Sequence, residues 1–190
     1  MNLVALVLAA GAGRRFGGSK MSASFRGEPL IRHAIRAARA APVARVVVVC
    51  PAGLDIGAWP GSPPVSALPV ASDALSASLK AGMSAAAGAD GAFVFLGDMP
   101  LVPHAVAAHL ANVLDGNFAA LPRYDGRPGH PVLLSARAFA MLDLLDGDRG
   151  AGALLKDRAD IVFADGWPES ILLDVDRVED IGRLEARDSH

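Results

Sequence analysis

The stretch LVALVLAAGAGRRFGGSK, residues 3–20, begins with apolar side chains and ends in a glycine-rich, cationic segment. Its apolar run at 4–8 predicts a strand that is buried in the core. Four glycines, Arg14, Arg15 and Lys20 follow this run. A turn of this kind exposes backbone N–H groups and lets a phosphate approach closely. We therefore expect a phosphate-binding loop directly after the first strand.

Strand and helix patterns alternate along the first half of the chain. The predicted strands cover residues 4–8, 45–50, 65–68, 92–96, 118–121, 131–135 and 171–175. The predicted helices cover residues 30–41, 76–87, 103–114, 136–145, 151–158 and 178–187. This order predicts an α/β fold, with one three-layer α/β/α domain over residues 1–190 and a mainly parallel, Rossmann-like sheet. The stretch at 118–135 departs from the alternation and predicts a mixed or antiparallel edge.

The composition narrows the class of protein. The chain has 190 residues, of which 52% are hydrophobic and 20% charged, so it can bury a full core. A net charge of −2 argues against a nucleic-acid-binding protein, which would usually be basic. Cys50 is the only cysteine, which excludes a disulfide framework and a cysteine zinc cluster. The sequence shows no membrane span and no signal-peptide pattern, so we expect a cytoplasmic protein with no membrane partner.

Two familiar phosphate-binding motifs fail on specific residues of the loop. The dinucleotide fingerprint G-x-G-x-x-G fits Gly11 and Gly13 but requires glycine at Phe16. It also requires an acidic residue near the end of the second strand, where the sequence reads VVVVCP. The P-loop requires lysine directly after its second glycine, but counting from Gly13 this position holds Ser19 and Lys20 comes one place late. These departures disfavour an NAD-dependent oxidoreductase and a P-loop NTPase.

A third pattern fits the loop without a shift. LAAGAGRRFGGSK, residues 8–20, resembles the signature L-A-A-G-x-x-x-R-[MF]-G-x-x-K of nucleotidyltransferases that transfer a nucleotide from an NTP. Further similar segments are GEPLIRHAI, LSASLKAG, LGDMPLV, GHPVLLS, GDRGAGALL and LLDVDRVEDI. Together they resemble the molybdenum cofactor cytidylyltransferases and guanylyltransferases, which implies a GT-A-like nucleotidyltransferase fold. The LAAG sequence, in place of the LAGG of the guanylyltransferases, favours CTP.

The resemblance implies roles for the charged residues. Arg15 and Lys20 would hold the triphosphate, Arg15 as a planar fork for two oxygens and Lys20 as a point charge near the α-phosphate. Asp98, at the carboxyl end of a predicted strand, would be a hard oxygen ligand for Mg²⁺. The second metal ligand would be Asp176, which aligns with the second acidic position of the family. Asp174 is the alternative, because residues two apart on a strand share a face. Arg15, Lys20 and Asp98 are thus the expected catalytic residues.

The resemblance also implies which residues bind the two substrates. The nucleotide site would comprise Leu8, Ala9, Ala10, Gly11, Gly13, Arg15, Lys20, Ser76 and Ser78. The hydroxyls of Ser76 and Ser78 would either cap a helix or contact the nucleotide, and the resemblance favours nucleotide contact for Ser78. His130 is expected to position the acceptor. Asp148 and Arg149 would either contact the acceptor or cap the helix at 151–158.

These assignments imply a Mg²⁺-dependent transfer of CMP from CTP to the terminal phosphate of molybdopterin, with release of pyrophosphate. Residues 1–100 would form the nucleotide-binding half and residues 101–190 the acceptor-binding half. The alternatives are a guanylyltransferase, a nucleotidyltransferase for another phosphorylated small molecule, and a module that only binds an NTP or the cofactor. A molybdoenzyme or maturation factor would be a transient partner.

Overall fold

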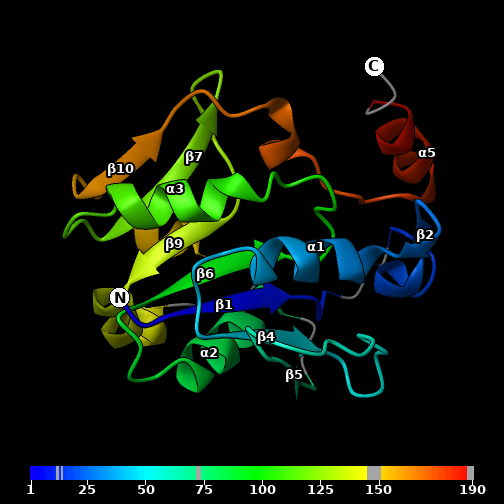
Figure 1. Ribbon diagram of the computed structural model, residues 1–190, viewed down its shortest axis with the longest axis horizontal. Helices are drawn as coiled ribbons and strands as arrows, with labels where there is room; N and C mark the ends of the chain where they lie inside the picture. Colours follow the sequence, from blue (N-terminus) through cyan, green and yellow to red (C-terminus); the bar gives the residue numbers. More distant parts are fainter. Residues whose placement is uncertain (12, 14, 72–73, 145–150, 188–190) are drawn as a thin grey trace.

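The computed structural model describes residues 1–11, 13, 15–71, 74–144 and 151–187. Among these residues, eight strands form one sheet in the order β10-β7-β9-β6-β1-β4-β5, with β8 paired to β7 (Figure 1). The strands are β1 (Leu3–Leu8), β4 (Arg45–Cys50), β5 (Val65–Pro69), β6 (Gly91–Leu96), β7 (Ala119–Tyr124), β8 (Arg127–Pro128), β9 (Val132–Ser135) and β10 (Ile161–Ala164). A small hairpin pairs β2 (Ser24–Phe25) with β3 (Glu28–Pro29).

The central strand β1 sets the direction of the sheet. It runs parallel to both β4 and β6, so that Leu8 lies between Val49 and Leu96 at the carboxyl ends of the three strands. Strand β5 pairs parallel with β4, and β10 pairs parallel with β7. Strand β9 runs antiparallel to both β6 and β7. The predicted mainly parallel sheet with a mixed side is therefore confirmed.

Helices cover both faces of the sheet. They are α1 (Leu30–Arg39), α2 (Leu75–Ala85), α3 (Ala105–Val113), α4 (Gly152–Leu155) and α5 (Val178–Arg187), with the 3-10 helices η1 (Lys20–Ser22), η2 (Ala136–Leu144) and η3 (Glu169–Leu172). Alternate residues of β1 enter two cores: Ala5 and Val7 lie in the core with α1 and α3, and Leu6 and Leu8 in the core with α2. Figure 1 shows α1 and α3 in front of the sheet and α2 behind it. The predicted three-layer α/β/α architecture is confirmed.

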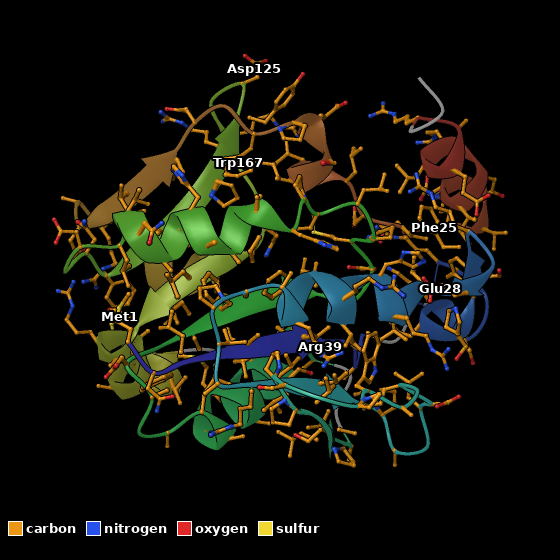
Figure 2. The ribbon with its side chains drawn as sticks, viewed as in Figure 1. Met1, Phe25, Glu28, Arg39, Asp125 and Trp167 are labelled. Carbon is orange, nitrogen blue, oxygen red and sulfur yellow. The ribbon has the colours of Figure 1, made fainter. Side chains whose placement is uncertain are left out.

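A third, smaller core joins the last helix to the start of the chain. It contains the buried side chains of Phe25, Leu30, Val175 and Leu184. Figure 2 shows Phe25 at the end of the molecule where α5 packs. The backbone N–H of Val175 donates to the carbonyl of Asp98 over 2.9 Å. This core and this hydrogen bond hold the segment before α5 against the turn that follows β6.

Some elements differ from those that the sequence predicts, and the 136–144 segment is a 3-10 helix. Residues 171–175 do not form the predicted strand: the chain there leaves η3 and continues as extended backbone at Leu173. The carbonyl of Ile171 accepts from the His130 N–H, so this segment bonds to loops instead of a sheet partner. Strand β10 was not predicted, and it completes the sheet beside β7. No helix among the described residues has the length and apolar character needed to cross a bilayer.

Candidate active site

The glycine-rich loop follows β1 at the carboxyl edge of the sheet. Gly13 has φ +53° and Gly17 has φ +76°, which are left-handed conformations that favour glycine. A Cβ at Gly13 would lie 3.3 Å from the Cβ of Lys20, so the loop passes closely over the lysine stem. The loop therefore folds back on itself and delivers Lys20 to the end of the sheet.

Lys20 lies between two carboxylates. Its side chain is buried, with 9% exposed, and its Nζ donates to Asp98 Oδ2 over 2.6 Å. The same Nζ lies 3.5 Å from Asp176 Oδ1. Arg15 reaches Asp176 Oδ2 over 3.4 Å from a side chain that is 74% exposed. The structure therefore brings together Arg15, Lys20, Asp98 and Asp176, four of the charged residues that the sequence singled out.

Asp98, Asp174 and Asp176 form a three-carboxylate cluster. Each offers an oxygen, and these oxygens lie within 4.8 Å of one another. Val175 is fully buried between the two later aspartates, so both flanking side chains are left at the surface beside Asp98. The sequence argument that Asp174 and Asp176 share one face therefore holds, although it is extended chain and not a sheet strand that places them.

Asp180 fixes the backbone that carries Asp176. Its Oδ2 accepts from the backbone N–H of Asp176 over 3.0 Å and of Arg177 over 2.8 Å. These bonds satisfy N–H groups at the start of α5 that have no intrahelical partner. They also lower the pKa of Asp180, chiefly through the Arg177 N–H. Sequence reasoning missed Asp180, although an acidic residue in the first turn of a predicted helix is a visible signal.

The donor set of the cluster suits a hard divalent cation. Carboxylate oxygens are the ligands that Mg²⁺ and Mn²⁺ prefer. Although Asp174 reaches the surface, partial loss of water around its carboxyl group, and then the negative charges of Asp98 and Asp176, raise its pKa. A cation would relieve this repulsion. Within the described ranges, this is the one group of three acidic, histidine or cysteine side chains that is close enough to share an ion.

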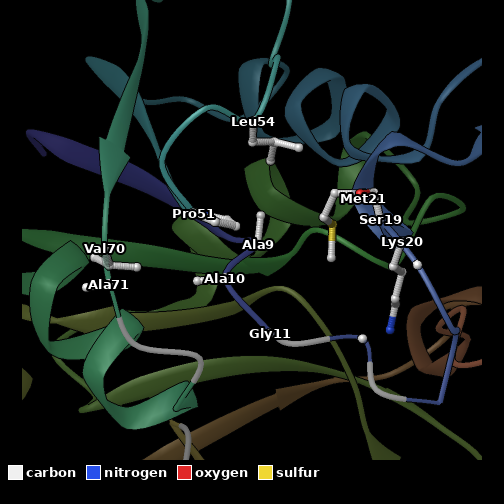
Figure 3. Close-up of a pocket in the computed structure, with 12 residues that line it drawn as sticks. Ala9, Ala10, Gly11, Ser19, Lys20, Met21, Pro51, Leu54, Val70 and Ala71 are labelled. Carbon is white, nitrogen blue, oxygen red and sulfur yellow. The ribbon is translucent and has the colours of Figure 1, made fainter.

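A pocket of about 330 Å³ opens beside Lys20 (Figure 3). Figure 3 shows Ala9, Ala10 and Gly11 at its centre, Ser19, Lys20 and Met21 on one side, and Pro51, Leu54, Val70 and Ala71 on the other. Of the predicted nucleotide residues, Ala9, Ala10, Gly11, Gly13 and Lys20 line it. Pro51 and Leu54 also line the pocket and were not predicted, although Pro51 directly follows a predicted parallel strand, where ligands of α/β sheets bind.

Four predicted nucleotide residues do not line this pocket. Arg15 instead contacts Asp176. Leu8 lines a different cavity, together with His130. Ser76 and Ser78 are buried in α2, and the hydroxyl of Ser78 donates to the Ala74 carbonyl over 3.3 Å. That bond is a helix-backbone contact of the kind that serine makes one turn back. Asp148 and Arg149, predicted on the acceptor side, lie outside the described residues.

His130 is among the residues that line this second cavity. Its Nδ1 is 3.4 Å from the carbonyl oxygen of Val94. Burial lowers the pKa of the imidazole, and the hydrogen bond with Val94 and the charge of Asp98 oppose this shift. A lowered pKa means that the ring is neutral at pH 7.

Comparison with known proteins identifies structures similar to this fold. The structure is similar to that of a homologue of Rv0371c from Mycobacterium sp. strain JC1, with 26% identity, a TM-score of 0.81 and coverage of 97% of this chain and 96% of that one. It is also similar to a manganese complex of Rv0371c from Mycobacterium tuberculosis H37Rv, with 25% identity, a TM-score of 0.76 and coverage of 98% and 99%.

A curated relative is the bifunctional enzyme IspD/IspF of Novosphingobium aromaticivorans, which is 33% identical over an alignment of 127 residues that covers 64% of this chain. The match spans only 33% of that protein. The model of the MobA-like NTP transferase domain matches residues 5–162, which include the loop, Lys20, Asp98 and His130. The chain therefore belongs to the MobA-like NTP transferase domain family.

Proposed function

We propose that the protein is a Mg²⁺-dependent nucleotidyltransferase that transfers CMP from CTP to the terminal phosphate of molybdenum cofactor. The observation that carries the proposal is the position of Lys20. It lines the candidate nucleotide pocket, and its ammonium group contacts Asp98 in the carboxylate cluster. A triphosphate in this pocket would therefore have a cation and a metal site at its reacting end.

The chemistry requires charge neutralisation more than proton transfer. An oxygen of the acceptor phosphate attacks the α-phosphorus of CTP, a new P–O bond forms, and the bond between the α- and β-phosphates breaks to release pyrophosphate. A phosphate monoester has a second pKa of about 6, so the attacking oxygen is already largely ionised at neutral pH. The site therefore needs no general base, and the residues at hand are cations and carboxylates.

Each charged residue then has a separate task. Lys20 would hold the α-phosphate as a buried point charge, and Arg15 would reach outer phosphate oxygens from its exposed position. Asp98 and Asp176, with Asp174 beside them, would hold Mg²⁺, which when bound stabilises the negative charge that develops on the phosphates. Asp180 would keep Asp176 in place through the two backbone hydrogen bonds described above.

The choice of CTP rests on the LAAG sequence at residues 8–11 and on the pocket beside it. Every described residue that lines this pocket lies between positions 9 and 71, which supports a nucleotide-binding first half. The acceptor would approach from the side of His130, in the second half of the chain. A molybdoenzyme or maturation factor would then receive the product.

Pyrophosphate release tests the proposal. The purified protein is mixed with Mg²⁺, molybdenum cofactor and either CTP, GTP or ATP. Release with CTP alone is expected, and Asp98→Asn should abolish it. Asp125→Asn is a matched control in an exposed turn (Figure 2), and it should leave the rate unchanged. Release with GTP alone would overturn the base assignment. NTP binding without pyrophosphate release would indicate that the protein is a binding module or that it uses another acceptor.

A further inference from the structure

Phe16 is the one large apolar side chain among the described residues of the phosphate-binding loop, which are 11, 13 and 15–19. A Cβ added at Gly11, Gly17 or Gly18 would meet nothing within 4 Å, so these parts of the loop pass through open space. Phe16 is half-buried and packs against the third core, which was described with the fold. It is not among the described residues that line the nucleotide pocket. Phe16 is therefore an apolar contact of the loop for which the proposed transfer gives no task.

The third core also attaches α5 to the rest of the molecule. Its buried members are Phe25, Leu30, Val175 and Leu184. In α5, which the structure describes completely, only Leu184 is buried. The neighbouring Glu185 accepts from the backbone N–H of Arg26 over 2.6 Å, which places α5 against the β2–β3 hairpin. Phe16 therefore packs on the same small core that holds α5 in place.

Charged residues of the site lie next to the core residues in the sequence. Arg15 precedes Phe16 in the loop, and Val175 stands between Asp174 and Asp176. Arg15 Nη1 is 3.4 Å from Asp176 Oδ2, but both side chains are largely exposed, so this ion pair alone is weak. The packing of Phe16 and Val175 in one core is then the stronger constraint on the distance between the loop and the carboxylates.

We propose that Phe16 is a positioning residue that holds the phosphate-binding loop against the segment carrying Asp174 and Asp176. The inference rests on the proposed function, in which the loop binds the phosphates and those aspartates bind the metal. A glycine-rich loop without such a contact samples many backbone conformations, and phosphate binding must then order it. Ordering one backbone residue lowers affinity about tenfold. Phe16 removes this cost because the loop is already in place when the phosphates arrive.

Calorimetric titration of the protein with inorganic tripolyphosphate in excess Mg²⁺ tests this role without turnover. The probe has the phosphate chain of an NTP and no base, so the result depends on neither the base nor the acceptor. Phe16→Ala should weaken binding about tenfold, and Phe16→Met, which keeps a long apolar side chain, should restore most of it. Phe163→Ala, which removes a half-exposed phenylalanine from β10, is the control and should change nothing. Unchanged affinity in Phe16→Ala would overturn the proposal.

Hydrogen exchange of the backbone amides tests whether Phe16 connects the two segments. It is measured without ligand on peptides that cover residues 15–24 and 173–187. Because Phe16 is only half-buried, we expect Phe16→Ala to stay folded, and peptides from β4 and β6 should exchange as in the wild type. Both the loop peptide and the α5 peptide should exchange faster in this variant. Faster exchange in the loop peptide alone would show that Phe16 does not hold the two segments together.

Leu184→Ala tests the same contact from α5. It should weaken tripolyphosphate binding, and the double variant with Phe16→Ala should bind little worse than either single variant, because one shared contact is lost. Leu110→Ala removes an equally buried leucine from the core under α3 and should leave the affinity unchanged. Fully additive losses would contradict the proposal.

Pyrophosphate release from CTP is measured separately on the wild type. If release fails while phosphate binding still depends on Phe16, the proposed transfer is wrong and the positioning role stands. If release occurs and phosphate binding does not depend on Phe16, the positioning role alone is refuted.

Discussion

The ammonium group of Lys20 lies where a metal ion would contact Asp98. Lys20 should therefore compete with metal binding. Its Nζ donates to Asp98 Oδ2 over 2.6 Å and lies 3.5 Å from Asp176 Oδ1. A cation that binds the cluster before the nucleotide must displace this ammonium group. We expect Lys20→Met to bind Mn²⁺ more tightly than the wild type in the absence of nucleotide, although it should lose turnover.

The size of the effect follows from the contact that is removed. A hydrogen bond between charged groups contributes about 1.5–3 kcal/mol. Each 1.4 kcal/mol corresponds to roughly a factor of ten in affinity. Lys20→Met should therefore tighten Mn²⁺ binding by about 10- to 100-fold. Without metal, three carboxylates within 4.8 Å lose their buried cation, so the variant should unfold at lower urea concentration until Mn²⁺ is added.

Titration of free Mn²⁺ by electron paramagnetic resonance measures this affinity directly. Both proteins are measured at the same pH. Lys20→Arg keeps the charge and should stay near the wild type. Arg15→Met removes only an exposed pair, worth at most about 1 kcal/mol, and should change the affinity no more than about fivefold. Equal Mn²⁺ affinity in folded Lys20→Met and wild type would refute the idea that Lys20 holds the cation position.

Three further predictions concern residues around the site. Asp180→Ala should cost about 1 kcal/mol in urea unfolding at pH 7 and lower the Mn²⁺ affinity, because the Asp180 carboxylate holds the N–H groups of Asp176 and Arg177. Because the pKa of Asp180 is lower in the folded protein, this stabilisation is fully present above the unfolded pKa of about 4. It is lost as the pH falls from there through the folded pKa. A difference between the two proteins that persists unchanged at low pH would contradict the assignment. Gly129→Ala places a Cβ 2.5 Å from the carbonyl oxygen of Ile171 and should cost about 1–3 kcal/mol, seen as a lower Tm, whereas Gly152→Ala in open space should not. Ser78→Ala should change CTP affinity less than about twofold, because the hydroxyl already bonds Ala74; a larger loss in calorimetry would restore its predicted contact with the nucleotide.

The local sequence determined the layers of the fold and the phosphate-binding loop after β1. The run VVVV at 46–49 and the five apolar residues at 92–96 each predict a buried strand. The structure has β4 and β6 at these positions. Glycines at 11, 13, 17 and 18 before Lys20 indicate a tight turn at the end of β1. The position of Asp98 just past β6 follows from the same strand pattern, because ligands bind at the carboxyl ends of parallel strands.

The tertiary structure decided what these residues contact. Residues 171–175 have the apolar content of a strand, but their backbone partners are the N–H of His130 and the carbonyl of Asp98, which no local pattern reveals. Strand β10 is only four residues long and forms where β7 offers a free edge. Ser78 follows the expected motif, and its place within α2 turns its hydroxyl to the helix backbone. The contact between Lys20 and Asp98 joins residues 78 positions apart. Such pairings depend on how strands order and helices pack, so they are set by the whole chain and not by any one segment of it.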